Sequence, residues 1–282
     1  MVPITRDGYI KKVSMRSYNA SNTDPTGMKD SDSVLAYGSC STLDTLLFFT
    51  NRGTYGYLPV YEIEEGKWKD LGSHLGNYIK MDSNEKIIQA YFLRSFNPNV
   101  QVIMASQFGM IKRSRLSDFE VSRNNKSMVC MKIGSMDQVV SVTLSYSPED
   151  SIAVVSQQGY ALQYSAQEVA MMTLRTKGVK AMNLGKEDCI ADVTILQADK
   201  QVLLVGDKAQ MKRLKVEEIA QLKRPAKGNR LYKWVKSNPV YVKSIYAVEA
   251  NQGFDLMSED PIHFEAKDIS LMNASATFSI PF

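Results

Sequence analysis

The sequence predicts an all-β fold built from six similar units, and three observations lead to this expectation. A strand-like apolar run, a Thr or Ser, two further residues and a Gly recur about every fifty residues. A second Gly follows the first at a nearly fixed distance. Helix-like patterning is limited to short stretches such as 167–172 and 216–220, which we expect to form loops or single turns.

The first Gly of the repeat marks a predicted hairpin turn, because Gly supplies the positive φ that a tight turn needs. It stands at Gly8, Gly53, Gly109, Gly159 and Gly253, and Lys208 takes its place in a weaker fifth copy. Five intervals separate residues 8 and 253, so the mean period is 49 residues. Each copy offers about four strand segments, which is typical of a propeller blade. An open β-solenoid is the alternative.

The second Gly lies 19 or 20 residues after the first. Its occurrences are Gly27, Gly72, Gly178 and Gly228. No linker rich in Pro, Gly or Ser divides the chain, so we expect one domain, 1–282. The expected blades are 1–43, 44–99, 100–149, 150–199, 200–245 and 246–282.

The amino-acid composition limits the possible classes of function but does not identify one. The chain has 282 residues, of which 44% are hydrophobic, and a net charge of +4. This weakly basic balance permits nucleic-acid binding. Cys40, Cys130 and Cys189 form no paired motif, so buried thiols are expected rather than a disulfide or a metal site. No apolar run is long enough to span a membrane, and no signal peptide is evident. We therefore expect a cytoplasmic protein, associated with the bacterial nucleoid if it binds DNA, and a longer polypeptide preceding Met1.

Three phrases resemble repeats of the type IIA topoisomerase C-terminal domain: GYIKK at 8–12, GMIKR at 109–113 and KGVKAMNL at 177–184. The resemblance covers essentially the whole chain. It implies a β-pinwheel, a propeller variant in which strands are exchanged between neighbouring blades. The sequence is therefore identified as an all-β, six-bladed β-pinwheel of four-stranded blades.

Two branches of this family share the domain. The gyrase A subunit carries a Gln-Arg-Arg-Gly-Gly-Lys-Gly box in its first blade, whereas residues 17–27 read SYNASNTDPTG. The phrases RSYNAS at 16–21 and WKDLG at 68–72 are similar to the topoisomerase IV A subunit of the Gram-positive type. This resemblance implies a role in decatenation and relaxation during chromosome segregation. The DNA-wrapping domain of the gyrase A subunit is the alternative.

The resemblance also implies binding partners, and it implies which parts of the enzyme carry out catalysis. The partners would be duplex DNA, the remainder of the topoisomerase IV A subunit, which precedes this domain, and through it the B subunit. The parent enzyme would be an ATP-dependent topoisomerase with its ATP site on the partner subunit. This chain has no Arg-Tyr dipeptide, no acidic Mg²⁺ cluster and no phosphate-cradling Gly loop. We therefore expect no catalysis and no metal or other cofactor in this domain.

Cations are the candidate DNA ligands, because phosphate contacts supply most sequence-independent affinity. Three basic pairs share nearly one phase of the repeat: Lys11-Lys12, Lys112-Arg113 and Lys212-Arg213. We expect them on an exposed belt that binds and bends duplex DNA on a basic outer rim. Further candidates are Arg16 and the cations near the second Gly, Lys177, Lys180, Lys227 and Arg230. The second-Gly cations are the better candidates if the pairs do not bind.

Two rival functions remain. One is a protein-interaction propeller without nucleic acid, although the Trp-Asp and double-glycine marks of such classes are missing. The other is an enzyme using carboxylates at equivalent places in three repeats, Asp32, Asp137 and Asp188. We prefer to interpret these as turn residues that accept backbone hydrogen bonds.

Overall fold

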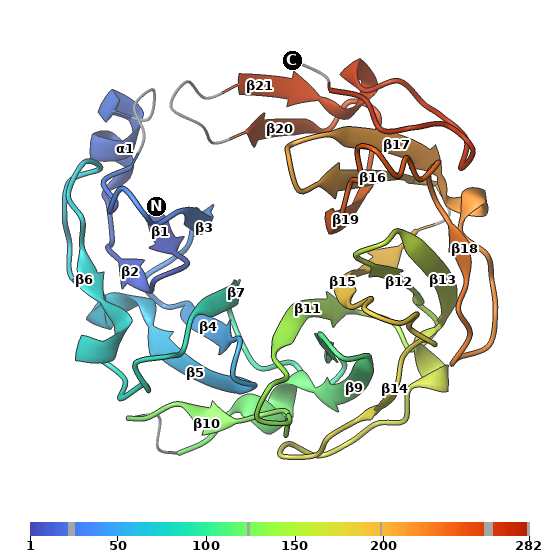
Figure 1. Ribbon diagram of the computed structural model, residues 1–282. Coiled ribbons are helices and arrows are strands. Elements are labelled where there is room, and N and C mark those ends of the chain that lie inside the picture. The colour runs from blue at the N-terminus through green and yellow to red at the C-terminus, as the bar shows by residue number, and fades with distance from the viewer. Residues whose placement is uncertain (22–25, 123–124, 198, 257–261, 281–282) are drawn as a thin grey trace. The chain divides into compact units, whose positions relative to one another are not determined.

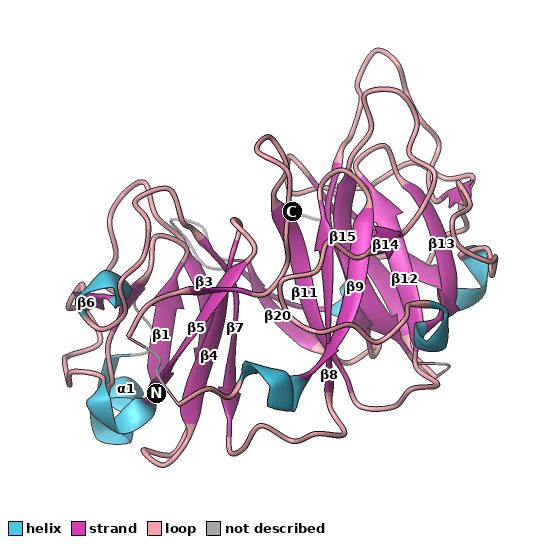
Figure 2. Ribbon diagram, turned by 90° about the horizontal axis from the view of Figure 1, so that it is seen from below, coloured by secondary structure: helices cyan, strands magenta, loops and turns pink. Residues whose placement is uncertain are grey.

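The computed structural model describes residues 1–21, 26–122, 125–197, 199–256 and 262–280. Strands dominate these residues and the helices are short (Figures 1 and 2). The described chain forms two compact units. Unit 1 contains 1–98, 115–142 and 173–176, and unit 2 contains 99–114, 143–172 and 177–282. Within the described part of the chain, no helix is long and apolar enough to cross a membrane.

Unit 1 contains two four-stranded sheets. The first has the order β3-β1-β2-β6, with β1 (Val2–Thr5), β2 (Tyr9–Ile10), β3 (Val34–Gly38) and β6 (Ser73–His74). The second has the order β10-β5-β4-β7, with β4 (Thr45–Thr50), β5 (Thr54–Pro59), β7 (Ile87–Leu93) and β10 (Met128–Val129).

The third and fourth sheets repeat this plan. The third has the order β11-β8-β9-β14, with β8 (Gln101–Ser106), β9 (Met110–Arg115), β11 (Val139–Ser145) and β14 (Val179–Lys180). The fourth, in unit 2, has the order β15-β12-β13-β18, with β12 (Ser151–Ser156), β13 (Tyr160–Ser165), β15 (Ile190–Leu196) and β18 (Asn229–Arg230).

Two smaller sheets follow in unit 2. The fifth has the order β17-β16-β19, with β16 (Gln201–Gly206), β17 (Met211–Lys215) and β19 (Val242–Val248). The last is a hairpin of β20 (Gly253–Leu256) and β21 (Ile262–Glu265).

Helical segments are brief. The single α-helix among the described residues, α1 (Met15–Ser21), begins after Ser14, whose hydroxyl accepts from the Ser17 N–H. Six 3-10 helices are described: η1 (Val60–Glu62), η2 (Leu75–Asn77), η3 (Leu116–Phe119), η4 (Ala166–Glu168), η5 (Val216–Glu218) and η6 (Ala266–Asp268). The segments 167–172 and 216–220 thus contain single turns, as expected.

The second to fifth repeats each donate one strand to the preceding sheet. β6 lies between β5 and β7 in the chain but pairs with β2 of the first sheet. β10, β14 and β18 pair in the same way with β5, β9 and β13. We call these four two-residue elements the outer strands. The exchange of strands that the family resemblance implied is therefore present.

The second Gly makes this exchange sterically possible. Gly178 and Gly228 have φ values of 90° and 76°, which L side chains rarely adopt. A Cβ at Gly178 would overlap with the carbonyl oxygen of Ile111, and one at Gly228 with that of Ala161. The donated segment therefore lies directly on the backbone of its host sheet, where only Gly fits.

Apolar first strands build the core of each unit. In β4 every residue after Thr45 is buried, so this strand is covered on both faces. Side chains of the first two sheets form one cluster that includes Ile4 and Phe48. The fourth and fifth sheets form another that includes Val155 and Leu204. Full burial of each such side chain contributes about 1.5–3 kcal/mol.

The prediction of six four-stranded blades is wrong in number. The described residues contain five sheets of three or four strands, and the sixth repeat yields only the β20–β21 hairpin. The second-glycine position of that repeat holds Phe278, so the fifth sheet gains an isolated bridge between Met211 and Ser279 instead of an outer strand.

Two turn assignments also need correction. The positive φ of the fifth hairpin is at Ala209 (59°), not at Lys208. With this shift, Ala209 precedes Gly228 by 19 residues, the same interval as in the other repeats. Gly253 begins β20 instead of turning a hairpin, and the β20–β21 connection lies outside the described residues.

The close approach at Gly178 predicts that Gly178→Ala destabilises the fold strongly. Both the left-handed φ and the overlap with Ile111 oppose a Cβ there, so we expect a loss of about 2–4 kcal/mol in the free energy of unfolding. Gly134→Ala is the matched control, because a Cβ there would meet only the Asp137 Cβ, at 3.9 Å. Urea titrations of the two variants measure the difference, and equal midpoints would contradict the steric argument.

Candidate nucleic-acid interface

The three basic pairs are largely buried, so the expectation of an exposed belt at these residues is wrong. Lys11, Lys112 and Lys212 are 2%, 0% and 0% exposed, and Arg113 and Arg213 are each 8% exposed. Lys12 is half-buried. The corrected turn at Ala209 places Lys11, Lys112 and Lys212 three residues after their turn positions, in one phase of the repeat. The pattern was real, but it marks an inward-facing position.

These lysines hold the donated segments in place. Lys11 Nζ donates to the backbone carbonyls of Trp68 and Asp70, just before Gly72. Lys212 Nζ donates to the carbonyl of Ala276, two residues before Phe278. Burial lowers the pKa of both lysines to about 8, although Asp70 and Glu218 partly oppose the shift. A buried ammonium ion is tolerated here because backbone oxygens replace its water.

The neighbouring arginines are also engaged in the protein. Arg213 donates from Nε to the Ile269 carbonyl and from its guanidinium to the Gln201 side chain. Arg113 donates to the equivalent Gln101. Burial lowers the pKa of both guanidinium groups. Of the remaining candidates, Arg16 is exposed on α1.

The cations near the second Gly are placed differently. Lys177, Lys180 and Lys227 are exposed and Arg230 is half-buried. Lys180 and Arg230 are the second residues of their outer strands, where they pair with Met110 and Tyr160. These four predicted residues therefore lie at sheet edges. The residues that correspond to Lys180 and Arg230 in the first two sheets are His74 and Val129.

A further set of lysines was missed by the sequence reasoning. In each of four repeats, a backbone N–H that follows the second-glycine position by five residues, or by eight in the case of Lys80, donates to the carbonyl two residues before that position in the next repeat. The pairs are Lys80–Asn125, Lys132–Thr176, Asn183–Ala226 and Lys233–Ala276. Three of these four donors are exposed lysines. The insertion of η2 shifts Lys80 by three residues, and Ser127 replaces the Gly before Lys132, so the regular interval was hidden.

In unit 2, hydrogen bonds join the segments that carry the cations of the fourth and fifth repeats. Asn183 bonds to Pro225 and Ala226, and the Arg224 guanidinium donates to the Lys180 carbonyl. These bonds bring the loop before β18 against β14. The resulting surface, which we call the unit 2 cation patch, consists of Lys177, Lys180, Lys223, Lys227, Arg230 and Lys233.

No carboxylate neutralises this patch by direct pairing. Within the described ranges, salt bridges occur elsewhere, such as Lys86–Asp7 and Lys200–Glu249, and none includes a residue of the patch. Glu168, which lies near the patch, accepts from the Arg224 backbone N–H. Unpaired cations close together raise the local potential and favour a polyanionic ligand.

The aromatic rings at these edges are covered by cations. Lys227 Nζ lies 4.1 Å from the centroid of the Tyr160 ring, and Lys29 Nζ lies 4.6 Å from that of Tyr9. A ring whose face holds a cation is less available to stack on a base. These two rings are therefore not open stacking platforms.

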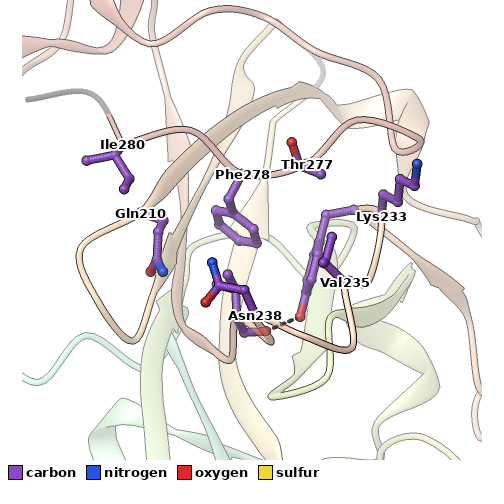
Figure 3. Close-up of a pocket in the computed structure, with 9 residues that line it drawn as sticks. Gln210, Lys233, Val235, Asn238, Thr277, Phe278 and Ile280 are labelled. Carbon is purple, nitrogen blue, oxygen red and sulfur yellow. Dashed lines mark hydrogen bonds between the residues drawn. The ribbon is translucent and has the colours of Figure 1, made fainter.

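A cavity of about 250 Å³ lies at the edge of the fifth sheet, where Phe278 replaces the second Gly (Figure 3). Figure 3 shows Phe278 between Gln210 and Val235, with Asn238 beneath it. The Tyr232 ring packs edge-on against Phe278, with centroids 4.7 Å apart. The bulky side chain thus accounts for the loosened edge. The volume is below the usual range of ligand pockets, about 300–1,000 Å³.

The aspartates of the rival enzyme hypothesis behave as turn residues. The Asp32 carboxylate accepts from the backbone N–H groups of Asp7 and Ser33. Asp188 accepts from those of Gln158 and Cys189, and Asp137 from Gln138. Within the described residues, no group of three His, Cys, Asp or Glu side chains could hold a metal ion.

The buried Lys11 predicts a measurable pH dependence of stability. Its pKa is about 8 in the folded chain, below the unfolded value, so the unfolded state binds the extra proton between these two values. The free energy of unfolding should therefore rise with pH above about 8, by up to about 1.4 kcal/mol per pH unit from this residue. Lys11→Met should lack that rise, whereas Lys12→Met should retain it. Denaturant titrations from pH 7.5 to 10 test this, and parallel curves for wild type and Lys11→Met would refute it.

Comparisons with known proteins agree with this geometry. The family model described as DNA gyrase C-terminal domain, beta-propeller, matches residues 44–93, 101–145, 150–196 and 200–234. The A subunit of DNA topoisomerase 4 from Bacillus subtilis is 32% identical over 89% of this chain, and that from Staphylococcus epidermidis is 34% identical over 89%. In both cases the match covers 31% of the relative, so the chain spans about a third of their length.

Solved structures extend the similarity to the fold. The C-terminal domain of a DNA topoisomerase IV is 32% identical with a TM-score of 0.85, and the match covers 99% of this chain and 87% of that one. A DNA gyrase A C-terminal domain, 22% identical, has a TM-score of 0.79 over 99% of this chain and 93% of that one, and it shares the fold. The four-stranded sheets with exchanged outer strands are thus those of an all-β propeller of the pinwheel type. The chain belongs to the family of the DNA gyrase C-terminal domain, and its sequence relatives include topoisomerase IV A subunits.

Proposed function

We propose that this chain is a non-catalytic DNA-binding domain of a topoisomerase IV A subunit. The observation that carries the proposal is the unit 2 cation patch, in which cations of the fourth and fifth repeats lie on segments joined by hydrogen bonds and, among the described residues, form no salt bridge. Each cation can displace a counterion from a DNA phosphate, which gives affinity that is independent of base sequence.

The ligand that fits the patch best is duplex DNA. Its cations come from the edges of successive sheets, so a duplex that follows them meets phosphates at several points. Bending along the surface would add a deformation cost, which these contacts would offset. In the parent enzyme this engagement would support decatenation and relaxation, in concert with the remainder of the A subunit, which precedes the domain, and with the B subunit.

The choice of topoisomerase IV over gyrase rests on two observations. The relatives at 32–34% identity are topoisomerase 4 A subunits, and the gyrase box is absent from residues 17–27. A gyrase-type domain would be expected to wrap DNA tightly around itself, with one handedness of the wrap. A topological assay of closed circular DNA with this domain separates the two, because a gyrase-type domain alone should trap supercoils of one sign.

Removing three cations of the patch should weaken DNA binding in a defined way. The triple variant Lys177→Ala, Lys180→Ala, Lys227→Ala loses up to three phosphate contacts. The slope of log affinity against log salt should therefore fall by about 2.7, that is, about 0.9 per contact. Fluorescence anisotropy with a labelled duplex at 50–200 mM salt measures the slope, and two duplexes of unrelated sequence should give the same change.

The control keeps the same change in net charge. Lys215, Lys243 and Lys267 belong to unit 2, lie outside the outer strands and are exposed. Their triple Ala variant should bind DNA with nearly the wild-type slope. Equal slopes for the two triple variants would place the DNA elsewhere, and a wild-type chain that does not bind duplex DNA at low salt would reject the proposed function.

A further inference from the structure

We propose that Arg230 is a preorganised phosphate-binding residue, held between two aromatic rings so that its terminal nitrogens meet a single phosphate of the duplex. The inference deepens the proposed DNA binding and rests on it. It distinguishes one residue of the unit 2 cation patch, whose other members include flexible lysines, as the anchor of the bound duplex.

The guanidinium of Arg230 is fixed by three contacts. Its Cζ lies 4.5 Å from the centroid of the Tyr160 ring and 4.9 Å from that of Trp234. Its Nε donates to the carbonyl oxygen of Gln158, at 3.1 Å. The rings restrict the plane of the group, and the hydrogen bond restricts its rotation. The side chain therefore has one strongly favoured orientation before any ligand arrives.

This arrangement leaves the phosphate-binding part of the group available. Among the described residues, the terminal nitrogens of Arg230 have no hydrogen-bond partner, and the residue forms no salt bridge. A guanidinium presents two parallel N–H groups that match two oxygens of a phosphate. Because the side chain is already ordered, binding loses less rotational freedom than it would at a mobile lysine.

The supporting rings are themselves held in place. The Trp234 ring meets Tyr241 edge-on, with centroids 5.5 Å apart, and lies 6.2 Å from the Tyr232 ring. The Tyr232 hydroxyl donates to the Val240 carbonyl at 2.5 Å. On Tyr160, Lys227 Nζ shares the ring with Arg230 at 4.1 Å. The negative ring face offsets part of the repulsion between these two cations, so both can remain at one edge.

The other sheets lack this combination at the same position. The equivalent residue is His74 in the first sheet, Val129 in the second and Lys180 in the third. Lys180 pairs with Met110, which offers no aromatic face. Lys180 is therefore a matched comparison: a cation in the same place on an outer strand, without the stacked rings.

The test measures affinity for a labelled duplex between 50 and 200 mM salt. Arg230→Ala and Lys180→Ala should each reduce the salt slope by about 0.9, which shrinks the ratio of affinities across this range by about 3.5-fold. Arg230→Ala should lose more affinity than Lys180→Ala at every salt concentration. Arg230→Lys keeps the charge and should keep the slope, but it should bind roughly two- to tenfold more weakly.

Positioning by Trp234 is tested separately. Trp234→Leu retains every cation, so its salt slope should equal that of wild type while its affinity falls. Trp234→Tyr restores a ring and should recover most of that affinity, which a change in folding alone would not produce. Thermal melting of each variant confirms that the fold is retained, and Tyr160→Phe should bind as wild type does.

The outcomes separate this inference from the proposed function. If wild type binds duplex DNA but Arg230→Ala matches Lys180→Ala and Trp234→Leu matches wild type, the anchor role is overturned and the proposed function stands. If wild type itself does not bind duplex DNA, the proposed function fails first. A larger affinity loss for Arg230→Ala, together with recovery in Trp234→Tyr, supports the inference.

Discussion

The donation of one short strand to the preceding sheet by each of four repeats is the constraint on which the rest of the structure depends. Each outer strand contains only two residues, so its few backbone hydrogen bonds are a weak attachment. The attachment is secured by the second Gly, which lets the segment lie directly on the host backbone. Where Gly is replaced by Phe278, the strand shrinks to one bridge and a cavity opens beside it.

The buried lysines follow from the same constraint. Carbonyl oxygens a few residues before the second-glycine position of a donated segment, such as those of Trp68 and Ala276, accept from a lysine of the host sheet. Lysine is long enough to reach them from the host strand, and its ammonium group satisfies them at the cost of burying a charge. Sheets two and four have Gly56 and Leu162 at this position, so lysine is one solution among several. The basic pairs that recur at this position of the repeat therefore indicate how donated segments attach to their host sheets, and they do not indicate a ligand-binding site.

Sequence reasoning could find the repeat but not the side of the sheet that each residue faces. The period, the hairpin turns at Gly8, Gly53, Gly109 and Gly159, and the second Gly all follow from backbone requirements visible in the sequence. A lysine at a fixed position of the repeat gives the same sequence pattern whether its side chain points to water or to a backbone carbonyl. Lys11 and Lys212 were therefore wrongly assigned to an exposed DNA-binding surface. The helix α1 was missed because its seven residues bury no side chain and carry no apolar stripe. Lys80 and Lys132 were missed because an insertion and a Gly-to-Ser change conceal their register.

The second Gly affects both the packing of the outer strand and the placement of the candidate interface residues. A residue without a side chain lets the outer strand approach its host closely, and this approach turns the residues just before and two after it toward the sheet edge. Lys177 and Lys180 flank Gly178 in this way, as Lys227 and Arg230 flank Gly228. The position two residues after the second Gly accepts different residue types, because His74 and Val129 occupy it in the first two sheets and the outer strand still forms. The charge at the sheet edge therefore differs between sheets, whereas the position before the outer strand holds Gly in three of these four sheets and Ser127 in the second. A DNA-binding surface built on such edges can vary in strength from sheet to sheet on an unchanged scaffold.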